Sequence, residues 1–411
     1  MKAYQDASLA PARRAKALLE EMTLAEKVGQ LNQRLYGFRI YERKCVNGED
    51  TIELSEEFRQ EVEKYSGLGV LYGLYRADPW ADKDYETGLT GVLSKKAYNQ
   101  VQRYVLEHSR LGIPVMMSSE CPHGHQALDG YLLPVNLLAG ATFDPAMVRA
   151  AYRVSGRQLQ NMGVDFALMS MLDVLRDPRW GRSEECYSED PYLSARMAEA
   201  AVIGMQESGP EVVAKHFAAQ GEGTGGVNAS AARIGERELR EIHFPPAAAA
   251  IKAGAKGIMA AYNEIDGVYC HANRWLLNDV IRKEMGFDGI VMSDGVAIDQ
   301  LDSMTGDNVV SGALALQSGV DVGLWDEAFG KLEEAVRRGL VKEAQIDQAV
   351  LRVLTLKFER GLFEHPYLEE EGEIHMDYAQ NPESVQLARG GLVILQNKNQ
   401  VLPFWENQAS G

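Results

Sequence analysis

Residues 144–174 read DPAMVRAAYRVSGRQLQNMGVDFALMSMLDV, and they contain the signals of one helix followed by one strand. Asp144 and Pro145 supply a helix cap and a first-turn proline, and the apolar residues that follow have helical spacing up to about Gly163. Residues 165–174 then form an apolar run of strand length. We therefore predict a helix that leads directly into a buried strand.

The same alternation continues along the chain. Asp190 and Pro191 begin another predicted helix, which ends near Gly209. Strand and helix alternation over such a length predicts a parallel sheet with right-handed crossovers, and seven or eight units favour closure of that sheet. The predicted fold class is therefore α/β, a (β/α)8 TIM-like barrel. The predicted strands are 67–73, 114–120, 165–174, 212–217, 257–262, 289–294 and 320–324.

A doubly wound open sheet is the alternative fold. Its nucleotide-binding versions lose support, because no G-x-G-x-x-G follows the first predicted strand and no G-x-x-x-x-G-K-[ST] occurs in the chain.

The two ends of the chain differ from this repeating part. Thr23 and Glu26 have the spacing of a capping box, which predicts an opening helix, and the polar stretch 42–63 predicts helix and loop. Beyond Gly361 the chain turns acidic and then offers a helix and a strand-like run at 392–395. We predict a barrel domain at 1–360, then a linker and the first element of a truncated second α/β domain at 361–411.

The charge of the chain limits its partners. It has 59 Asp and Glu against 42 Lys and Arg, a net charge of −17 that disfavours binding to nucleic acid or to an anionic membrane surface. The four cysteines form no C-x-x-C pair, so they predict neither a zinc site nor a disulfide framework. The N-terminus has no apolar core of signal-peptide length, and no later stretch reaches the length of a membrane span, which predicts a cytoplasmic protein.

Polar residues gather at the carboxyl ends of the predicted strands. In a barrel these ends converge on one face, where active sites are built. A single carboxylate there is more often a helix cap or a loop ligand, but a set of six is harder to explain in that way. The six are Glu120, Asp173, Lys215, His216, Tyr262 and Asp294.

The sequence resembles glycoside hydrolase family 3, the β-glucosidase and β-xylosidase family, through ordered motifs along almost its whole length. These motifs are MTLAEKVGQL (22–31), SECPHG (119–124), RDPRWGR (176–182) continuing to SEDPYL (188–193), KHF (215–217), IGERELRE (234–241), AYNEIDG (261–267) and GFDGIVMSD (286–294).

This resemblance implies a role for five of the strand-end residues and for Arg182. It makes Asp294 the nucleophile of an exo-acting, retaining β-glycosidase whose substrate is a small β-linked saccharide or glycoside. Neighbouring Lys and Arg would favour the ionised carboxylate that such a nucleophile requires. The reaction needs carboxyl groups and oriented hydroxyl contacts, so no metal and no other cofactor is implied. The residues implied to line the glycosyl subsite are Glu120, Arg182, Lys215, His216 and Tyr262.

Other interpretations of the same residues remain open. Arg182 with Glu185 or Asp173 is equally well explained as a structural ion pair. Lys215 at a strand end also suits a Schiff-base lyase, and the whole site suits a non-catalytic sugar-binding barrel.

Two histidines invite a metal-site interpretation. His123 and His125 stand close together, but no third ligand stands at a supporting spacing, so we expect a loop histidine bonded to the backbone.

The chain departs from the family pattern in three respects. Gly295 stands where many relatives have Trp, so an aromatic wall of the subsite is absent or comes from elsewhere, and Val227 stands where many xylosidase-like relatives have Arg. The third departure concerns the general acid/base, which retaining hydrolysis requires at roughly 5 to 5.5 Å from the nucleophile. Relatives hold it in a following α/β sandwich or in a His/Asp pair after Lys-His-Phe, but residues 218–230 contain only Glu222 as a carboxylate. We therefore expect a C-terminal domain or a partner chain to supply it.

Overall fold

The centre of the molecule is a curved parallel sheet. The computed structural model describes residues 2–372 and 374–403. Its six-stranded sheet has the order β3-β4-β5-β6-β7-β10, so its strands follow chain order, and every neighbouring pair is parallel. The strands are β3 (Val70–Tyr72), β4 (Met116–Glu120), β5 (Phe166–Ser170), β6 (Glu211–Phe217), β7 (Gly257–Ala260) and β10 (Ile290–Met292).

Two irregular segments close this sheet into the (β/α)8 barrel that the sequence predicts. Segment 31–36 pairs with β3 through a parallel bridge between Tyr36 and Tyr72, and segment 320–325 pairs with β10 through Met292 and Val322. The two segments also bond to each other. The amide N of Gly323 donates to the Leu31 carbonyl at 3.0 Å, and the amide N of Trp325 donates to the Gln33 carbonyl at 3.0 Å. The sequence pattern had placed a regular strand at 320–324 and had not recognised 31–36 as part of the barrel.

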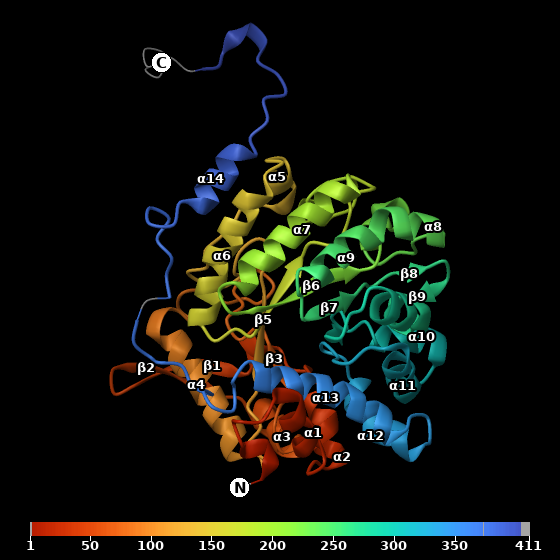
Figure 1. Cartoon of the computed structure of the whole chain (residues 1–411). Helices are drawn as coiled ribbons and strands as arrows, with labels where there is room; N and C mark the ends of the chain where they lie inside the picture. The colour runs from red at the N-terminus through yellow and green to blue at the C-terminus, as the bar shows by residue number, and fades with distance from the viewer. Residues whose placement is uncertain (1, 373, 404–411) are drawn as a thin grey trace.

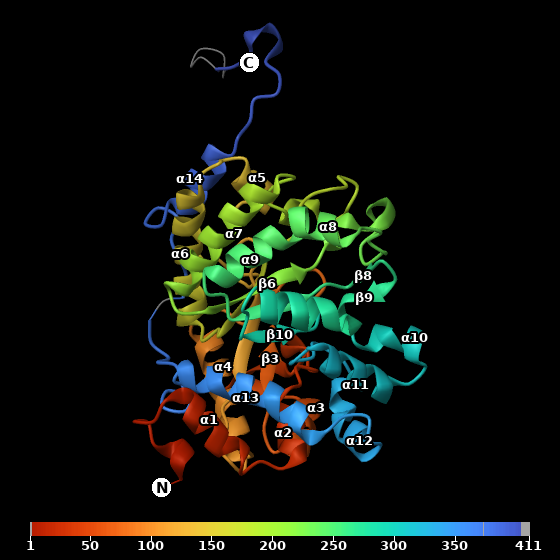
Figure 2. The ribbon, with the colours of Figure 1, turned by 45° about the vertical axis from the view of Figure 1, so that its right-hand side comes forward.

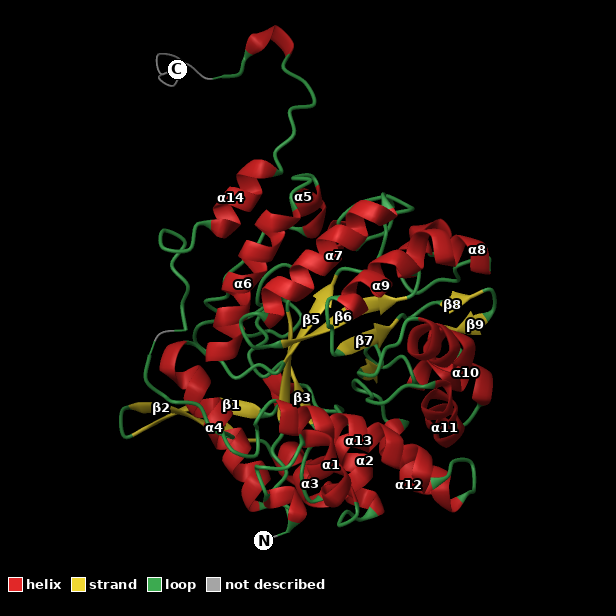
Figure 3. Ribbon diagram, in the orientation of Figure 1, coloured by secondary structure: helices red, strands yellow, loops and turns green. Residues whose placement is uncertain are grey.

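Helices surround the strands on the outside, as Figures 1 and 3 show. The caps at Asp144 and Asp190 are present, because the side chain of Asp144 accepts from the Ala146 amide at 2.9 Å and that of Asp190 from the Leu193 amide at 2.8 Å. The main helices after these strands are α4 (Gly91–Glu107), α6 (Pro145–Asn161), α7 (Pro191–Gln206), α9 (Phe244–Lys252), the π-helical stretch Trp275–Glu284, α11 (Asn308–Ser318) and α13 (Glu343–Glu359). Shorter elements are α5 (Asn136–Gly140), α8 (Glu236–Glu238), the π-helical turn Leu239–His243, α10 (Asp302–Thr305), α12 (Leu332–Arg337), β8 (Glu264–Ile265) and β9 (Val268–Tyr269).

The N-terminal region contains α1 (Pro11–Leu19), α2 (Leu24–Gln30), a hairpin of β1 (Tyr41–Val46) and β2 (Glu49–Leu54), and α3 (Glu56–Tyr65). The capping box of Thr23 and Glu26 begins α2 as expected. The prediction of only helix and loop over 42–63 is wrong, because the hairpin occupies much of it. Asn47 and Gly48 both have positive φ, 54° and 84°, and the Asn-Gly dipeptide is a hairpin-turn signal that was overlooked.

The chain beyond α13 returns along the outside of the barrel to α14 (Glu383–Gly390), which packs against α5 and α6 and is visible in the upper part of Figures 1 and 2. Residues 392–395 are 64% to 89% exposed and form no strand within 374–403, contrary to the strand-like pattern. An apolar segment becomes a strand only where a neighbouring strand pairs with it. The domain boundary at 360 stays a prediction.

No helix in the described part of the chain is both long and apolar enough to span a bilayer.

Candidate active site

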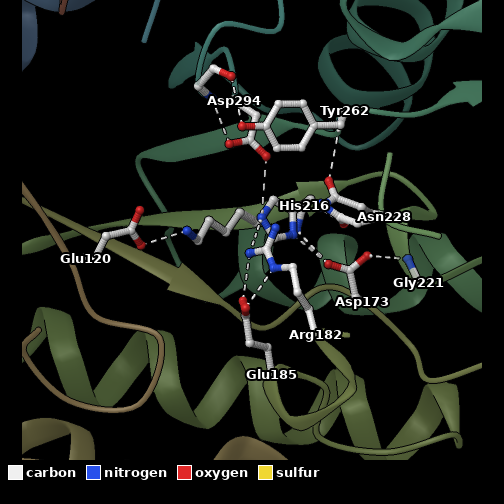
Figure 4. A network of polar contacts seen from close by, with 12 residues as sticks. Glu120, Asp173, Arg182, Glu185, His216, Gly221, Asn228, Tyr262 and Asp294 are labelled. Atoms are coloured by element: carbon white, nitrogen blue, oxygen red, sulfur yellow. Dashed lines mark hydrogen bonds and ion pairs between the residues drawn. The ribbon is translucent and has the colours of Figure 1, made fainter. Parts of the chain in front are cut away.

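All six residues predicted as nucleophile or subsite lining meet at the carboxyl ends of the strands. Glu120 is the last residue of β4, Lys215 and His216 lie in β6, Tyr262 follows β7 and Asp294 follows β10. Arg182 reaches the same place from the loop after β5. Figure 4 shows the side chains of five of them converging on the same region: Glu120, Arg182, His216, Tyr262 and Asp294.

Glu120 and Lys215 form a buried ion pair at one end of the group. Lys215 Nζ lies 2.7 Å from Glu120 Oε2, and the hydroxyl of Tyr72 donates to Glu120 Oε1 at 3.1 Å. Burial by itself would raise the pKa of Glu120, but the charges of Lys215 and Arg76 outweigh it and hold the pKa below its usual value. Glu120 is therefore an anionic acceptor, with lone pairs suited to hydroxyl donors.

Asp173 fixes the orientation of His216. Its Oδ2 lies 2.7 Å from His216 Nδ1 and also accepts from the His216 backbone amide at 3.3 Å, and its Oδ1 accepts from the Gly221 amide at 3.2 Å. Because Nδ1 carries the proton toward Asp173, Nε2 is left as an acceptor, and Arg182 Nη2 lies 3.0 Å from it.

Arg182 takes part in an ion pair and in the polar group around His216. Its Nε and Nη2 bond to the two oxygens of Glu185 at 2.7 and 2.8 Å. Burial would lower the pKa of Arg182, but Glu185 outweighs it and raises the pKa, while Arg182 correspondingly lowers that of Glu185 against the effect of burial. The ion-pair interpretation thus holds for Glu185 and not for Asp173. The guanidinium of Arg182 also faces His216, so the ion pair with Glu185 holds Arg182 in position at the site.

Asp294 has one carboxylate oxygen that no described residue hydrogen-bonds. The residue is 7% exposed, and its Oδ1 accepts from the Gly295 amide at 2.8 Å. Among the described residues Oδ2 has no hydrogen-bond partner, and it lies 3.6 Å from His216 Nε2. A buried oxygen of this kind is unusual, since most buried polar atoms are bonded. It marks Oδ2 as the atom available to a ligand.

His271 holds the backbone of Asp294 in place through a hydrogen bond. Its Nε2 accepts from the Asp294 amide at 3.1 Å. Burial lowers the pKa of His271 to about 3, so the ring is neutral near pH 7 and can accept this bond.

Tyr262 stands beside the same carboxylate. Its hydroxyl donates to the Gly295 carbonyl at 2.8 Å, and burial, followed by the charge of Asp294, raises its pKa. Tyr262 therefore stays protonated next to Asp294.

Glu222 does not have the surroundings of a general acid. Its Oε2 lies 3.5 Å from His243 Nε2 and 3.4 Å from Arg176 Nε. His243, and to a smaller extent Arg176, lower the pKa of Glu222, although burial by itself would raise it. A general acid requires the opposite shift, because it must hold its proton until the leaving group takes it.

The histidine pair at 123 and 125 shows no metal-binding arrangement. His125 is buried, and its Nε2 lies 2.9 Å from Ser119 Oγ, so its partner is a side chain and not the expected backbone group. Within 2–372 and 374–403, no three His, Cys, Asp or Glu side chains are arranged to hold a metal ion.

Three residues that support the site were not predicted as part of it: Tyr72, Glu185 and His271. Tyr72 lies near the end of a predicted strand, where its position was a usable signal. The sequence indicates Glu185 only as a structural partner of Arg182. His271 carried no signal, because its contact with Asp294 spans 23 residues and depends on how two loops fold together.

The fold and this site together define a class: a (β/α)8 barrel with a group of polar side chains at the carboxyl ends of its strands, where the active sites of barrel enzymes lie. Residues 23–356 match the Glycosyl hydrolase family 3 N terminal domain, and the chain therefore belongs to glycosyl hydrolase family 3.

Known relatives carry glycosidase names. Across its whole length the chain is 33% identical to a putative β-xylosidase from Formosa agariphila, of which it covers 54%. It is 30% identical, over 94% of its length, to the periplasmic β-glucosidase of Salmonella typhimurium, of which it covers 48%. The chain thus spans about half the length of these curated relatives.

Solved structures agree with this family. A β-glucosidase from Erythrobacter marinus has a TM-score of 0.86 and 32% identity, covering 98% of this chain and 52% of that one. The β-glucosidase from Listeria innocua in complex with glucose has a TM-score of 0.81 and 29% identity, over 95% of this chain and 53% of that one.

Proposed function

We propose that this chain is the nucleophile-carrying part of an exo-acting, retaining β-glucosidase or β-xylosidase, with Asp294 as the nucleophile. One observation carries the proposal: Asp294 Oδ2 is buried, has no hydrogen-bond partner among the described residues and lies 3.6 Å from His216 Nε2. An oxygen that is held in place but unbonded is suited to attack an anomeric carbon.

The reaction follows a double displacement. Asp294 Oδ2 forms a bond to the anomeric carbon while the bond to the aglycone oxygen breaks, and that oxygen takes a proton from a general acid. Water then attacks the same carbon, loses a proton to the conjugate base, and releases the Asp294 carboxylate. Glu120, Lys215 and Arg182 would hold the sugar hydroxyls through charge-assisted hydrogen bonds, which are strongest where water is excluded, and His216 would add a further hydrogen bond.

The general acid/base is proposed to come from a C-terminal domain or a partner chain. The carboxyl groups beside Asp294 are engaged: Glu120 with Lys215, Asp173 with His216 and Glu185 with Arg182. The relatives that the chain matches are about twice as long, which leaves room for a second domain. We expect the chain alone to be weak toward alkyl glycosides, whose leaving groups need protonation, and to react with activated aryl glycosides, whose leaving groups do not.

The test is covalent trapping of the nucleophile. A 2-deoxy-2-fluoro-β-glucoside with a dinitrophenolate leaving group, and its xylo-configured counterpart, are incubated with the chain, and the intact mass is measured. We expect one added fluoroglycosyl group, located at Asp294 by peptide mapping. The variant Asp294→Asn should stay unlabelled. Asp288→Asn, at the exposed opposite end of the same strand region, should label like the unmodified chain.

Two outcomes would favour the other interpretations. Binding of a gluco-configured iminosugar without any labelling would indicate a sugar-binding barrel. Trapping of an aldehyde substrate at Lys215 by borohydride would indicate a Schiff-base lyase. The ion pair of Lys215 with Glu120 speaks against the latter, because an ammonium has no lone pair for attack.

A further inference from the structure

An aromatic cluster lies beside the candidate nucleophile. Trp325 stacks on Tyr36 with a ring-centroid distance of 4.7 Å and an interplanar angle of 24°. It also meets Tyr72 edge-on at 4.8 Å and Trp80 at 5.2 Å. Tyr72 is fully buried, Tyr36 and Trp325 are partly exposed and Trp80 is 44% exposed, so the cluster extends from the core to the surface.

The ring of Trp325 occupies the space next to Gly295. A Cβ atom at position 295 would lie 2.4 Å from Trp325 Cε3 and 2.5 Å from Cζ3, which is closer than atoms can pack, and 3.3 Å from the Tyr262 hydroxyl. Trp325 is fixed there by its backbone, since its amide donates to the Gln33 carbonyl and the Val296 amide donates to the Leu324 carbonyl at 2.8 Å. Trp325 can therefore occupy this position only because residue 295 is glycine.

Two series of contacts connect the Asp294 end of the site with the Glu120 end. The polar series runs from Asp294 to His216, which Arg182 contacts from the loop after β5, and then to the adjacent Lys215, which bonds to Glu120. The aromatic series runs from Gly295 through Trp325 to Tyr72, whose hydroxyl donates to Glu120. A pyranose lying between these carboxylates would present hydroxyl groups to the first series and an apolar edge to the second.

We propose that Trp325 forms the aromatic wall of the glycone subsite and contacts the C5 edge of the sugar, so that it discriminates between glycones by their C5 substituent. This inference rests on the proposed function and specifies its glycone. A hexose such as glucose carries a hydroxymethyl group on C5, whereas xylose carries only hydrogen there. Contact of that group with the Trp325 face makes the pocket prefer gluco-configured over xylo-configured ligands. One such group in an apolar pocket changes affinity by about tenfold or more.

The test is a binding measurement with two probes. Isofagomine, a gluco-configured iminosugar with a hydroxymethyl group, and the same iminosugar without that group are titrated calorimetrically into the full chain. We expect a ratio of dissociation constants of about ten in favour of isofagomine. Trp325→Ala should bring the ratio close to one, and Trp325→Phe should retain part of it. Tyr192→Ala removes a 73% exposed aromatic ring elsewhere and should leave the ratio unchanged.

Substitution of Gly295 provides a second, independent test. Gly295→Ala pushes the Trp325 ring away, so it should lower the ratio by itself, and Gly295→Ala combined with Trp325→Ala should add little to Trp325→Ala alone. Circular dichroism confirms that each variant is folded.

An unchanged ratio in a folded Trp325→Ala variant would overturn the inference, as would additive effects of the two substitutions or failure of both probes to bind. These outcomes are separate from the labelling of Asp294. If Asp294 is labelled but the ratio of dissociation constants does not change in Trp325→Ala, only the proposed role of Trp325 is rejected. If Asp294 is not labelled but the ratio does change in Trp325→Ala, only the proposed nucleophile is rejected.

Discussion

At the scale of single residues, burial sets the protonation state of groups next to the site. His271, which accepts from the amide of Asp294, and His125, which contacts Ser119, are both almost fully buried. Burial lowers the pKa of each to about 3, from an ordinary value of 6.5. Both rings therefore act as neutral hydrogen-bonding groups, and their desolvation connects site geometry to the stability of the fold.

These two histidines predict acid sensitivity. Between pH 6.5 and about 3 the unfolded chain binds protons at these positions and the folded chain does not, so the free energy of unfolding falls as the pH falls. Each group contributes a slope of up to about 1.4 kcal/mol per pH unit. Urea unfolding at pH 6.5, 5.5 and 4.5 measures this slope.

Substitution identifies the source of the slope. His125→Gln should reduce it by one group's share, while His365→Gln, at an exposed histidine, should leave it unchanged. Equal slopes in His125→Gln and the unmodified chain would contradict the assignment.

At the scale of secondary-structure elements, close helix packing holds the outer layer on the barrel. Helices α6 and α7 contact each other extensively, and Gly204 in α7 allows their backbones to approach. A Cβ atom at position 204 would lie 2.3 Å from the Arg149 carbonyl oxygen of α6. Because backbone cannot move aside as a side-chain end can, this contact requires glycine.

The substitution Gly204→Ala is therefore expected to destabilise the protein although alanine is the better helix former. Helix propensity favours alanine by about 1 kcal/mol, whereas overpacking costs about 1 to 3 kcal/mol, and the rigid backbone contact puts this site at the upper end. We expect a net loss of about 2 kcal/mol by urea unfolding. Gly235→Ala, where a Cβ meets nothing within 4 Å, should change stability by less than about 0.5 kcal/mol. A stabilised Gly204→Ala variant would refute this account of the packing.

At the scale of the whole molecule, Lys357 of α13 joins distant parts of the barrel. It is fully buried, and its Nζ donates to Gln30 Oε1 at 2.6 Å and to the Pro114 carbonyl at 2.7 Å, with the Leu68 carbonyl at 3.5 Å. These acceptors lie at the end of α2 and just before β4 and β3. One side chain thus connects three segments near the amino ends of the strands.

Burial lowers the pKa of Lys357 to about 7, from 10.5. Between these values the unfolded chain holds a proton that the folded chain has released, so this group makes the free energy of unfolding rise with pH from about 7 to 10. The expected contribution is up to about 1.4 kcal/mol per pH unit. Unfolding curves at pH 7, 8.5 and 10 should show that contribution in the unmodified chain and in Lys331→Met, an exposed control, but not in Lys357→Met. Parallel pH profiles for the unmodified chain and Lys357→Met would show that Lys357 titrates normally.

Much of the barrel was predictable because its signals are local. The six sheet strands lie within or close to predicted ranges, and the caps at Asp144 and Asp190 begin the helices that they were expected to begin. Five of the six candidate site residues were found in the same way, since the carboxyl ends of parallel strands must meet. Arg182, which lies in the loop after β5, came only from the family resemblance. The hairpin at 41–54 was missed although Asn47 and Gly48 marked its turn.

The sequence by itself determined the alternation of strands and helices, the family and the set of polar residues at the strand ends, because each of these is written in short stretches of chain. The tertiary structure alone decided which segments close the barrel, which oxygen of Asp294 is unbonded, and that Trp325 fills the space left by Gly295. These features are contacts between residues far apart in the chain. They depend on differences of a few tenths of an ångström in contact distance, and no local pattern of residues encodes such differences.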